Sequence, residues 1–146
     1  MDYQIRELIP ADFERLFLLI QEFSIFEKSQ EKVTNSPQLM LQEQDLIKGF
    51  VVELDDGIIV AYSTYFFTYH SWVGKCLHMD DLYIQANFRK HGLGKQLIKT
   101  VIDFAKSQNC KQIRWQVSDW NSNAQQFYKN LGAEITNSEY DCFIRL

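Results

Sequence analysis

The chain has 146 residues, of which 46% are hydrophobic and 14% aromatic, and it carries a formal net charge of −4. This length and apolar content fit one globular domain with a sizeable core, and they exclude a disordered chain. The negative charge argues against non-specific nucleic-acid binding, and no apolar run reaches membrane-spanning length. We therefore expect a single domain over residues 1–146, with no nucleic-acid and no membrane partner.

The cysteines are Cys76, Cys110 and Cys142, an odd number without a CxxC pair. This pattern disfavours both a disulfide framework and a zinc site, so no metal is expected. Residues 1–4 open with an acidic residue and lack the apolar core of a signal peptide. We therefore expect a cytoplasmic protein.

The first third of the chain predicts a strand followed by two helices. Residues 3–8 alternate in the manner typical of a strand. Pro10 then precedes apolar residues that recur at helical spacing over 13–23, which predicts an amphipathic helix. Pro37 can begin a second helix, over about 37–47.

The middle of the chain predicts three β segments in succession. Residues 50–54 and 58–68 are rich in β-branched and aromatic side chains, and an Asp-Asp-Gly turn at 55–57 joins them as a hairpin. Another β-rich stretch runs over 73–84. Three adjacent segments of this kind favour a central antiparallel sheet.

The last third alternates helices and strands. The predicted elements are a long helix over about 92–107, a strand over 113–117, a helix over 122–131 and a last strand over 140–144. Ser122 with Gln125 resembles a capping box, and Gly132 suits a helix end. The complete order predicts a mixed α/β domain.

The most informative segment, residues 87–95, follows a predicted strand and opens a helix. Unpaired N–H groups at a helix start, together with the helix dipole, favour an anion. Gly92 and Gly94 allow the backbone to approach a diphosphate closely. Positive charge nearby comes from Arg89, Lys90 and Lys95. An ordinary strand-to-helix loop is the alternative; the Rossmann fingerprint and the P-loop both lack required residues here.

Two motifs carry a family resemblance. Arg89-x-x-Gly92-x-Gly94, placed before an amphipathic helix, resembles the acetyl-CoA motif of the GNAT N-acetyltransferase superfamily. The segment 121–133, which contains a Phe-Tyr pair and ends in Gly-Ala, resembles that superfamily's second signature, and the element order agrees over nearly the whole chain. Residues 65–75 and 77–84 are more closely similar to the diamine (spermidine/spermine and thialysine) N-acetyltransferase branch.

The resemblance implies an α/β fold, the GNAT-like acyl-CoA N-acyltransferase fold. This fold would have a mixed central sheet of about seven strands, with one parallel pair at its middle and about four helices on both faces. It implies acetyl-CoA as co-substrate, a small diamine or lysine-like primary amine as acceptor, direct attack in a ternary complex, and a homodimer. Three alternatives stay open: an acetyl-CoA sensor without turnover, acetylation of a protein or peptide amine, and transfer of a different acyl group.

The resemblance also assigns coenzyme-binding residues. Main-chain groups of Leu82, Tyr83 and Ile84 would pair with pantetheine as an added strand pairs with a sheet edge. Asn121 would bind the pantetheine arm or cap its own helix. Tyr128 would donate a proton to the coenzyme thiolate, or pack as a core tyrosine. The diphosphate turn would contribute Arg89, Lys90, His91, Gly92, Leu93, Gly94 and Lys95.

A primary amine is protonated at neutral pH, so a base must act before attack. Asp80 and Asp81 are adjacent on a predicted strand, and strand alternation directs them to opposite faces. The resemblance implies that Asp80 relays the proton through water and that Asp81 helps to bind the amine; solvated surface acids are the alternative. Glu27 and Trp72 match further substrate-side positions, although Trp72 could equally be a packed loop residue.

The chain departs from the diamine branch at three positions. His70 replaces an acid, and Tyr140 and Cys142 stand where the branch has an acid and a tryptophan. Fewer carboxylates weaken the grip on a long polycation, because each ammonium group needs a nearby anion. A shorter amine, a lysine analogue or a peptide amine is therefore favoured over spermine.

Overall fold

Five strands form one mixed sheet: β1 (Tyr3–Glu7), β2 (Lys48–Leu54), β3 (Ile59–His70), β4 (Gly74–Ile84) and β5 (Gln112–Arg114). They lie side by side in sequence order, and every neighbouring pair is antiparallel except β4 and β5. The expectation of about seven strands is therefore wrong. The parallel pair lies at the edge of the sheet and not at its middle, because β5 is the last strand of the ladder.

The computed structural model describes residues 1–146 and divides into two compact units, Met1–Trp115 and Gln116–Leu146. The sheet belongs entirely to the first unit. The expectation of a single domain stays a prediction. No helix has both the length and the apolar character needed to cross a membrane.

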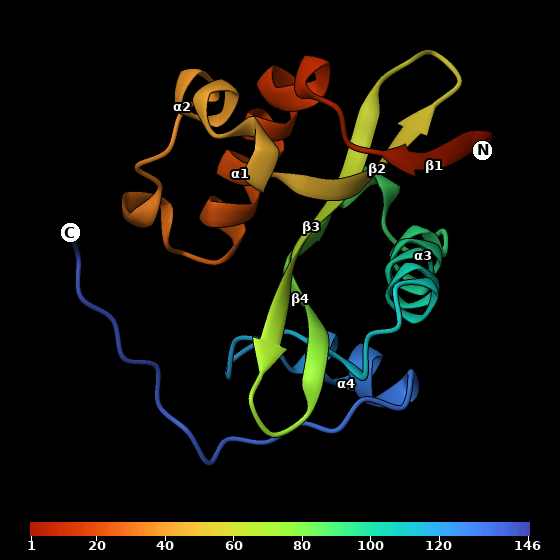
Figure 1. Ribbon diagram of the computed structural model, residues 1–146. Helices are drawn as coiled ribbons and strands as arrows, with labels where there is room; N and C mark the ends of the chain where they lie inside the picture. The colour runs from red at the N-terminus through yellow and green to blue at the C-terminus, as the bar shows by residue number, and fades with distance from the viewer. The chain divides into compact units, whose positions relative to one another are not determined.

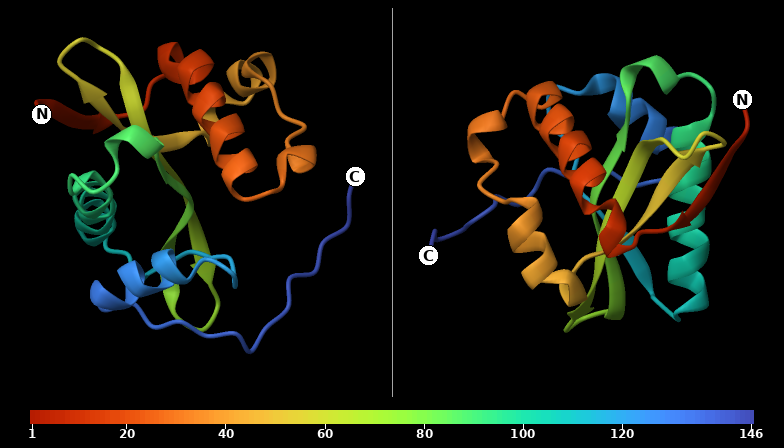
Figure 2. Two further views of the ribbon diagram at one scale, coloured as in Figure 1. Left: turned by 180° about the vertical axis from the view of Figure 1, so that it is seen from behind. Right: turned by 90° about the horizontal axis from the view of Figure 1, so that it is seen from above.

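Three α-helices cover the sheet of the first unit. Figures 1 and 2 show α1 (Phe13–Phe26) and α2 (Pro37–Gln42) on one face and α3 (Leu93–Ser107) on the other. The expected second helix is shorter than 37–47, since Glu43 closes α2 and residues 44–46 form a separate 3-10 turn. Each helix turns an apolar stripe toward the sheet, as amphipathic periodicity requires.

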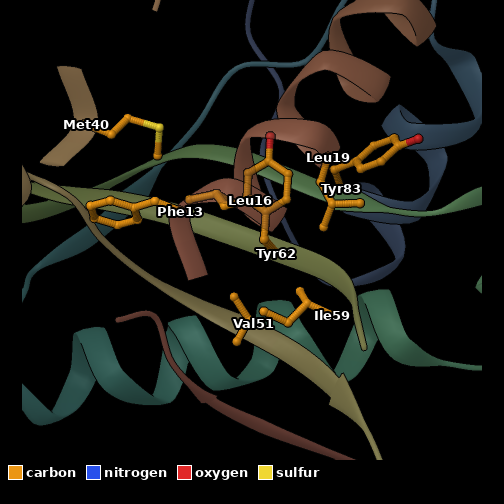
Figure 3. Close-up of a cluster of buried hydrophobic side chains, with 8 residues drawn as sticks. All are labelled: Phe13, Leu16, Leu19, Met40, Val51, Ile59, Tyr62 and Tyr83. Atoms are coloured by element: carbon orange, nitrogen blue, oxygen red, sulfur yellow. The ribbon is translucent and has the colours of Figure 1, made fainter. Parts of the chain in front are cut away.

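The core on the α1 face contains eight buried side chains (Figure 3). They are Phe13, Leu16, Leu19, Met40, Val51, Ile59, Tyr62 and Tyr83. Tyr62 and Tyr83 are paired across β3 and β4, so this core reaches the strands on which the predicted acids lie. The opposite face is packed by aromatic contacts, such as the edge-on contact between Phe50 and Phe104 of α3.

The second unit contains one helix, α4 (Ser122–Asn130). Asn121 caps it, because its Oδ1 accepts a hydrogen bond from the Ala124 N–H at 3.1 Å. The predicted capping box at Ser122 is therefore wrong by one residue. Gly132 follows the helix with φ of +93°, as expected for a helix end.

The predicted last strand over 140–144 does not form. Residues 134–146 have no regular secondary structure, and a strand exists only where its main-chain groups pair with a neighbour. Similarly, the strand expected over 113–117 is confined to Gln112–Arg114.

Candidate active site

The two adjacent acids lie at a β-bulge in β4. β3 and β4 pair in step up to Tyr65 with Met79, but the next pair joins Thr64 to Asp81 and leaves Asp80 without a partner. An extra residue of this kind breaks the strict alternation of side chains. Both Asp80 and Asp81 consequently line one pocket, which corrects the expectation that they face opposite sides of the sheet.

The pocket lies on the α1 side of the sheet and has a volume of about 180 Å³. Besides the two acids, its polar lining residues are Asn35, Lys48, Thr64 and Tyr65. The apolar part of the lining comes from α1, α2, the segment before β2, and β3: Leu16, Ile20, Met40, Leu46, Ile47 and Phe66. A site of this size and composition suits a small ligand with an apolar body and one cationic end.

Asp81 is held by two side chains of β3. The Tyr62 hydroxyl donates to Asp81 Oδ2 at 2.8 Å, and the Ser63 hydroxyl donates to the Asp81 carbonyl oxygen at 2.8 Å. Burial raises the pKa of Asp81 to about 6, the negative charges of Asp80 and Glu27 add to the rise, and the Tyr62 hydrogen bond opposes it. A carboxylate with this pKa is mostly ionised at neutral pH and can still accept a proton.

One edge of β4 has no strand partner over its second half. β5 pairs only with Cys76–His78, so the ladder on that edge stops before the bulge. Leu82, Tyr83 and Ile84 lie beyond this point, at the end of β4. An exposed strand edge can accept an extended amide-bearing chain, which is the form of a pantetheine arm.

The turn after β4 presents a row of free N–H groups. The groups of residues 90–95 make no hydrogen bonds, and the first one satisfied at the start of α3 is Gln96, which donates to the Gly92 carbonyl at 3.1 Å. Gly92 has φ of +81° and Lys90 has φ of +65°, so the turn is left-handed at two points. Successive N–H groups in such a turn form an anion-binding concavity, and they fit a diphosphate.

Within this turn, the side chains of the predicted residues differ in their surroundings. Leu93 is buried and anchors the start of α3, whereas Lys90, His91 and Lys95 are exposed. Gly94 lies in the first turn of the helix. The exposed side chains therefore place two ammonium groups and one imidazole near the free N–H groups.

Arg89 is turned toward β4. Its Nε donates to the Ile84 carbonyl at 2.8 Å, and its guanidinium lies 4.8 Å from the centre of the Phe26 ring and 5.5 Å from that of Tyr83. Glu22 on α1 accepts from the Tyr83 hydroxyl at 3.2 Å. These contacts join the end of β4 to α1, beside the strand edge.

Three further predicted residues belong to other parts of the chain. Trp72 is in the β3–β4 turn, 92% exposed, with its ring edge-on to His70. Glu27 follows the last residue of α1, and its charge acts on Asp81. Tyr128 is a buried residue of α4 in the second unit, beside the Phe127 ring.

Sequence reasoning missed Tyr62, Ser63 and the apolar pocket residues. The signal for Tyr62 is its place on the same face as Asp81, diagonally across two adjacent strands. That signal becomes readable only when the bulge is known.

Known proteins that resemble this chain identify its family. A sequence model of the acetyltransferase (GNAT) family matches residues 5–133. The chain belongs to this family. Thialysine N-epsilon-acetyltransferase of Bos taurus is 31% identical over 152 residues, spanning 95% of this chain and 89% of that protein. The protein of the same name from Caenorhabditis elegans is 30% identical, over 94% of this chain and 88% of that protein.

The fold agrees with solved GNAT structures. A crystal structure of an aminoglycoside acetyltransferase from an uncultured soil metagenomic sample, in complex with sisomicin, superposes with a TM-score of 0.81. It covers 98% of this chain and 97% of the other, at 18% identity. The protein is thus a GNAT acyltransferase that uses acetyl-CoA as co-substrate and acetylates an amine. The fold class, cofactor and reaction expected from the sequence are confirmed.

Proposed function

We propose that the acceptor is a small primary amine, a short diamine or a lysine-like amino acid, bound in the pocket beside Asp80 and Asp81. The observation that carries this proposal is the bulge in β4, which places two adjacent carboxylates in the lining of the same largely apolar pocket. One ammonium group can be neutralised there, and burial strengthens the attraction between opposite charges. The relatives named for thialysine agree with an acceptor of this size.

The pocket composition favours a short amine over a long polycation. Its two carboxylates are neighbours on β4, while the lining from α1, α2 and β3 is mainly apolar. A second ammonium group deep in this lining would lack an anion. An apolar spacer of a few methylene or thioether groups would instead contact Leu16, Ile20 and Met40.

The proposed reaction differs from the roles that the resemblance implies, because Asp81 and not Asp80 accepts the proton of the ammonium group. Asp80, which is exposed at the bulge, passes this proton through water to the solvent. The N–H electron pair stays on nitrogen, and the neutral amine attacks the thioester carbonyl of acetyl-CoA directly in a ternary complex. Tyr128 then gives its proton to the departing thiolate. The pKa of a thiol, about 8.5, makes this transfer feasible from a tyrosine as negative charge develops on sulfur.

Acetyl-CoA would be held by main-chain groups. The edge formed by Leu82–Ile84 would pair with the pantetheine amides, and the N–H groups of residues 90–95 would bind the diphosphate, with Lys90 and Lys95 adding charge. Arg89 would keep the end of β4 in place for this pairing. Asn121 and Tyr128 complete the proposed coenzyme site, and Glu27 and Trp72 the substrate site, on the family resemblance.

We further propose that both units act together as one acetyltransferase domain, since the family match over residues 5–133 spans them. A homodimer is supported by exposed aromatic side chains on and between β3 and β4: Phe66, Phe67, Tyr69 and Trp72. Three free cysteines support a reducing location, the cytoplasm.

The test is a thiol-release assay with acetyl-CoA and a panel of amines matched in length: n-butylamine, putrescine, lysine, thialysine and spermine. We expect turnover with the short members, and at least a hundredfold loss in Asp81→Asn. If coenzyme binding is measurable by calorimetry and no amine releases thiol, the proposal fails. Preference for spermine over every short amine would refute the substrate class alone.

A further inference from the structure

Tyr62 links the buried core to the acid pair. The residue is fully buried on β3, and its ring centre lies 6.4 Å from that of Tyr83. Figure 3 shows the ring standing among the core side chains, with the hydroxyl at the end remote from the β3 backbone. That hydroxyl donates to Asp81 Oδ2. Core packing thus restrains the Tyr62 ring, and the hydrogen bond from its hydroxyl restrains the Asp81 carboxylate.

The bulge makes this hydrogen bond possible. Because Thr64 pairs with Asp81, Tyr62 stands two residues further along β3 on the same face, a diagonal neighbour within reach of an aromatic side chain. The main chain of Asp81 is held separately, by the Ser63 hydroxyl. Two independent contacts therefore restrain the residue, one at its carbonyl oxygen and one at its carboxylate.

The two carboxylate oxygens of Asp81 have different surroundings. Oδ2 accepts from Tyr62, whereas Oδ1 has no hydrogen-bond partner, and Asp81 lines the pocket. The groups that act on the carboxylate are Asp80 on β4, Glu27 after the end of α1 and the Tyr62 hydroxyl on β3, and Lys48 of β2 lines the same pocket. The two acids oppose ionisation of Asp81, and the Tyr62 hydroxyl favours it.

We propose that Tyr62 is a positioning residue of the acetyl transfer: its hydroxyl holds Asp81 Oδ2 so that Oδ1 faces the pocket and accepts the proton of the substrate ammonium. In this step one N–H bond breaks, one O–H bond forms at Oδ1, and the electron pair stays on nitrogen for the attack. The inference rests on the proposed role of Asp81 as proton acceptor. Tyr62 itself keeps its proton throughout.

The experiment compares Tyr62→Phe with a matched control, Ser63→Ala, in the full-length protein. Each variant loses one hydroxyl donor to Asp81, but only Tyr62→Phe loses the donor to the carboxylate. The carboxyl titration is followed by NMR of protein labelled with 13C at aspartate, and the Asp81 signal is assigned by its loss in Asp81→Asn. The pH dependence of kcat/KM is measured on the same samples.

We expect the Asp81 midpoint to rise by about one pH unit in Tyr62→Phe, with about a tenfold fall of kcat/KM at pH 5.5, because a lost hydrogen bond to an anion has this size. Ser63→Ala should leave unchanged both the titration midpoint of Asp81 and the midpoint of the pH profile of kcat/KM. Global replacement of tyrosine by 3-fluorotyrosine, a stronger donor of the same size, should lower the midpoint, and it serves if Tyr62→Phe does not fold.

The possible results separate this inference from the proposed function. If the titration midpoint of Asp81 is unchanged in both Tyr62→Phe and the fluorotyrosine protein, the positioning role of Tyr62 is wrong. This conclusion holds even if Asp81→Asn abolishes the fall of kcat/KM at low pH, which would still support Asp81 as the proton acceptor. If Tyr62→Phe shifts the titration midpoint of Asp81 but does not shift the pH dependence of kcat/KM, Asp81 is not the proton acceptor. Both the proposed mechanism and the positioning role then fail.

Discussion

Replacing Asp81 by Asn should inactivate the enzyme and stabilise its fold. Burial and two neighbouring acids raise the pKa of Asp81 from its ordinary value of 3.8 to about 6. A rise of this size corresponds to an unfavourable free energy of up to about 3 kcal/mol for the ionised carboxylate in the folded state. An asparagine keeps the shape and an oxygen that accepts the Tyr62 hydrogen bond, but it carries no charge.

The sign of the effect follows from proton linkage. Between about pH 4 and pH 6 the folded protein holds the Asp81 proton and the unfolded chain does not, so the stability contributed by this group falls as pH rises. Below pH 4 both states are protonated and the wild type and Asp81→Asn should differ little. The difference should grow through the window to up to about 3 kcal/mol in favour of the variant at pH 7.

Urea unfolding at half-unit pH steps, followed by tryptophan fluorescence, measures this difference directly. Asp103→Asn is the matched control, because the Lys99 ammonium lowers the pKa of Asp103 and the expected sign is opposite. A variant that is less stable than the wild type at pH 7, or a difference that does not change with pH, would refute the argument that Asp81 is an electrostatically costly buried acid.

Other substitutions test separate parts of the site. Tyr128→Phe should lower kcat by about a hundredfold or more without changing acetyl-CoA affinity in calorimetry, and an unchanged kcat would exclude the acid role. Gly49→Ala would bring a Cβ to 2.3 Å from the Ser63 carbonyl oxygen, so β2 and β3 must separate. Urea unfolding should show a loss of about 1–3 kcal/mol, and wild-type stability would contradict that packing. Arg89→Ala removes the donor to the Ile84 carbonyl and should raise the KM for acetyl-CoA about tenfold; equal KM values would separate Arg89 from coenzyme binding.

The sequence was sufficient to predict the elements that depend on local pattern. Helical periodicity gave α1 and α3 nearly at their observed bounds, and the Asp-Asp-Gly turn correctly predicted the hairpin of β2 and β3. The glycines at 92 and 94 correctly predicted a turn with free N–H groups before α3. Each of these features is set by residues within about one helical turn or one hairpin, so neighbouring side chains suffice to specify it.

The bulge could not be predicted, and the arrangement of the acids depends on it. The pairs nearest the β3–β4 turn, such as His70 with Gly74, keep one register up to Tyr65 with Met79. If that register continued without a bulge, Tyr62 would lie opposite Leu82. Its side chain would then be on the other face of the sheet from Asp81, which is its observed hydrogen-bond partner. No residue type marks the bulge, since an Asp at this point is compatible with a regular strand.

The strand predicted over 140–144 is absent for a different reason. Residues 140–144 have the alternation of a strand, but a period of two describes only which side chains share a face. Whether a strand forms depends on a neighbour that supplies N–H and C=O partners, and the sequence of one segment does not contain that information. Pattern alone therefore predicted one strand too many, at 140–144, and the number of about seven came from the family resemblance.

The position of Asp81 explains why a core residue and the proposed proton acceptor are so closely joined. A carboxylate in water has a pKa too low to take a proton from an ammonium efficiently, and burial raises that pKa at the expense of stability. Burial alone would also leave the carboxylate free to turn. Tyr62 opposes the rise in pKa and restrains the rotation together, through one hydrogen bond fixed in the core. Burial and the surrounding acids keep the carboxylate basic, and the tyrosine hydrogen bond limits the rise in pKa so that Asp81 stays ionised at neutral pH.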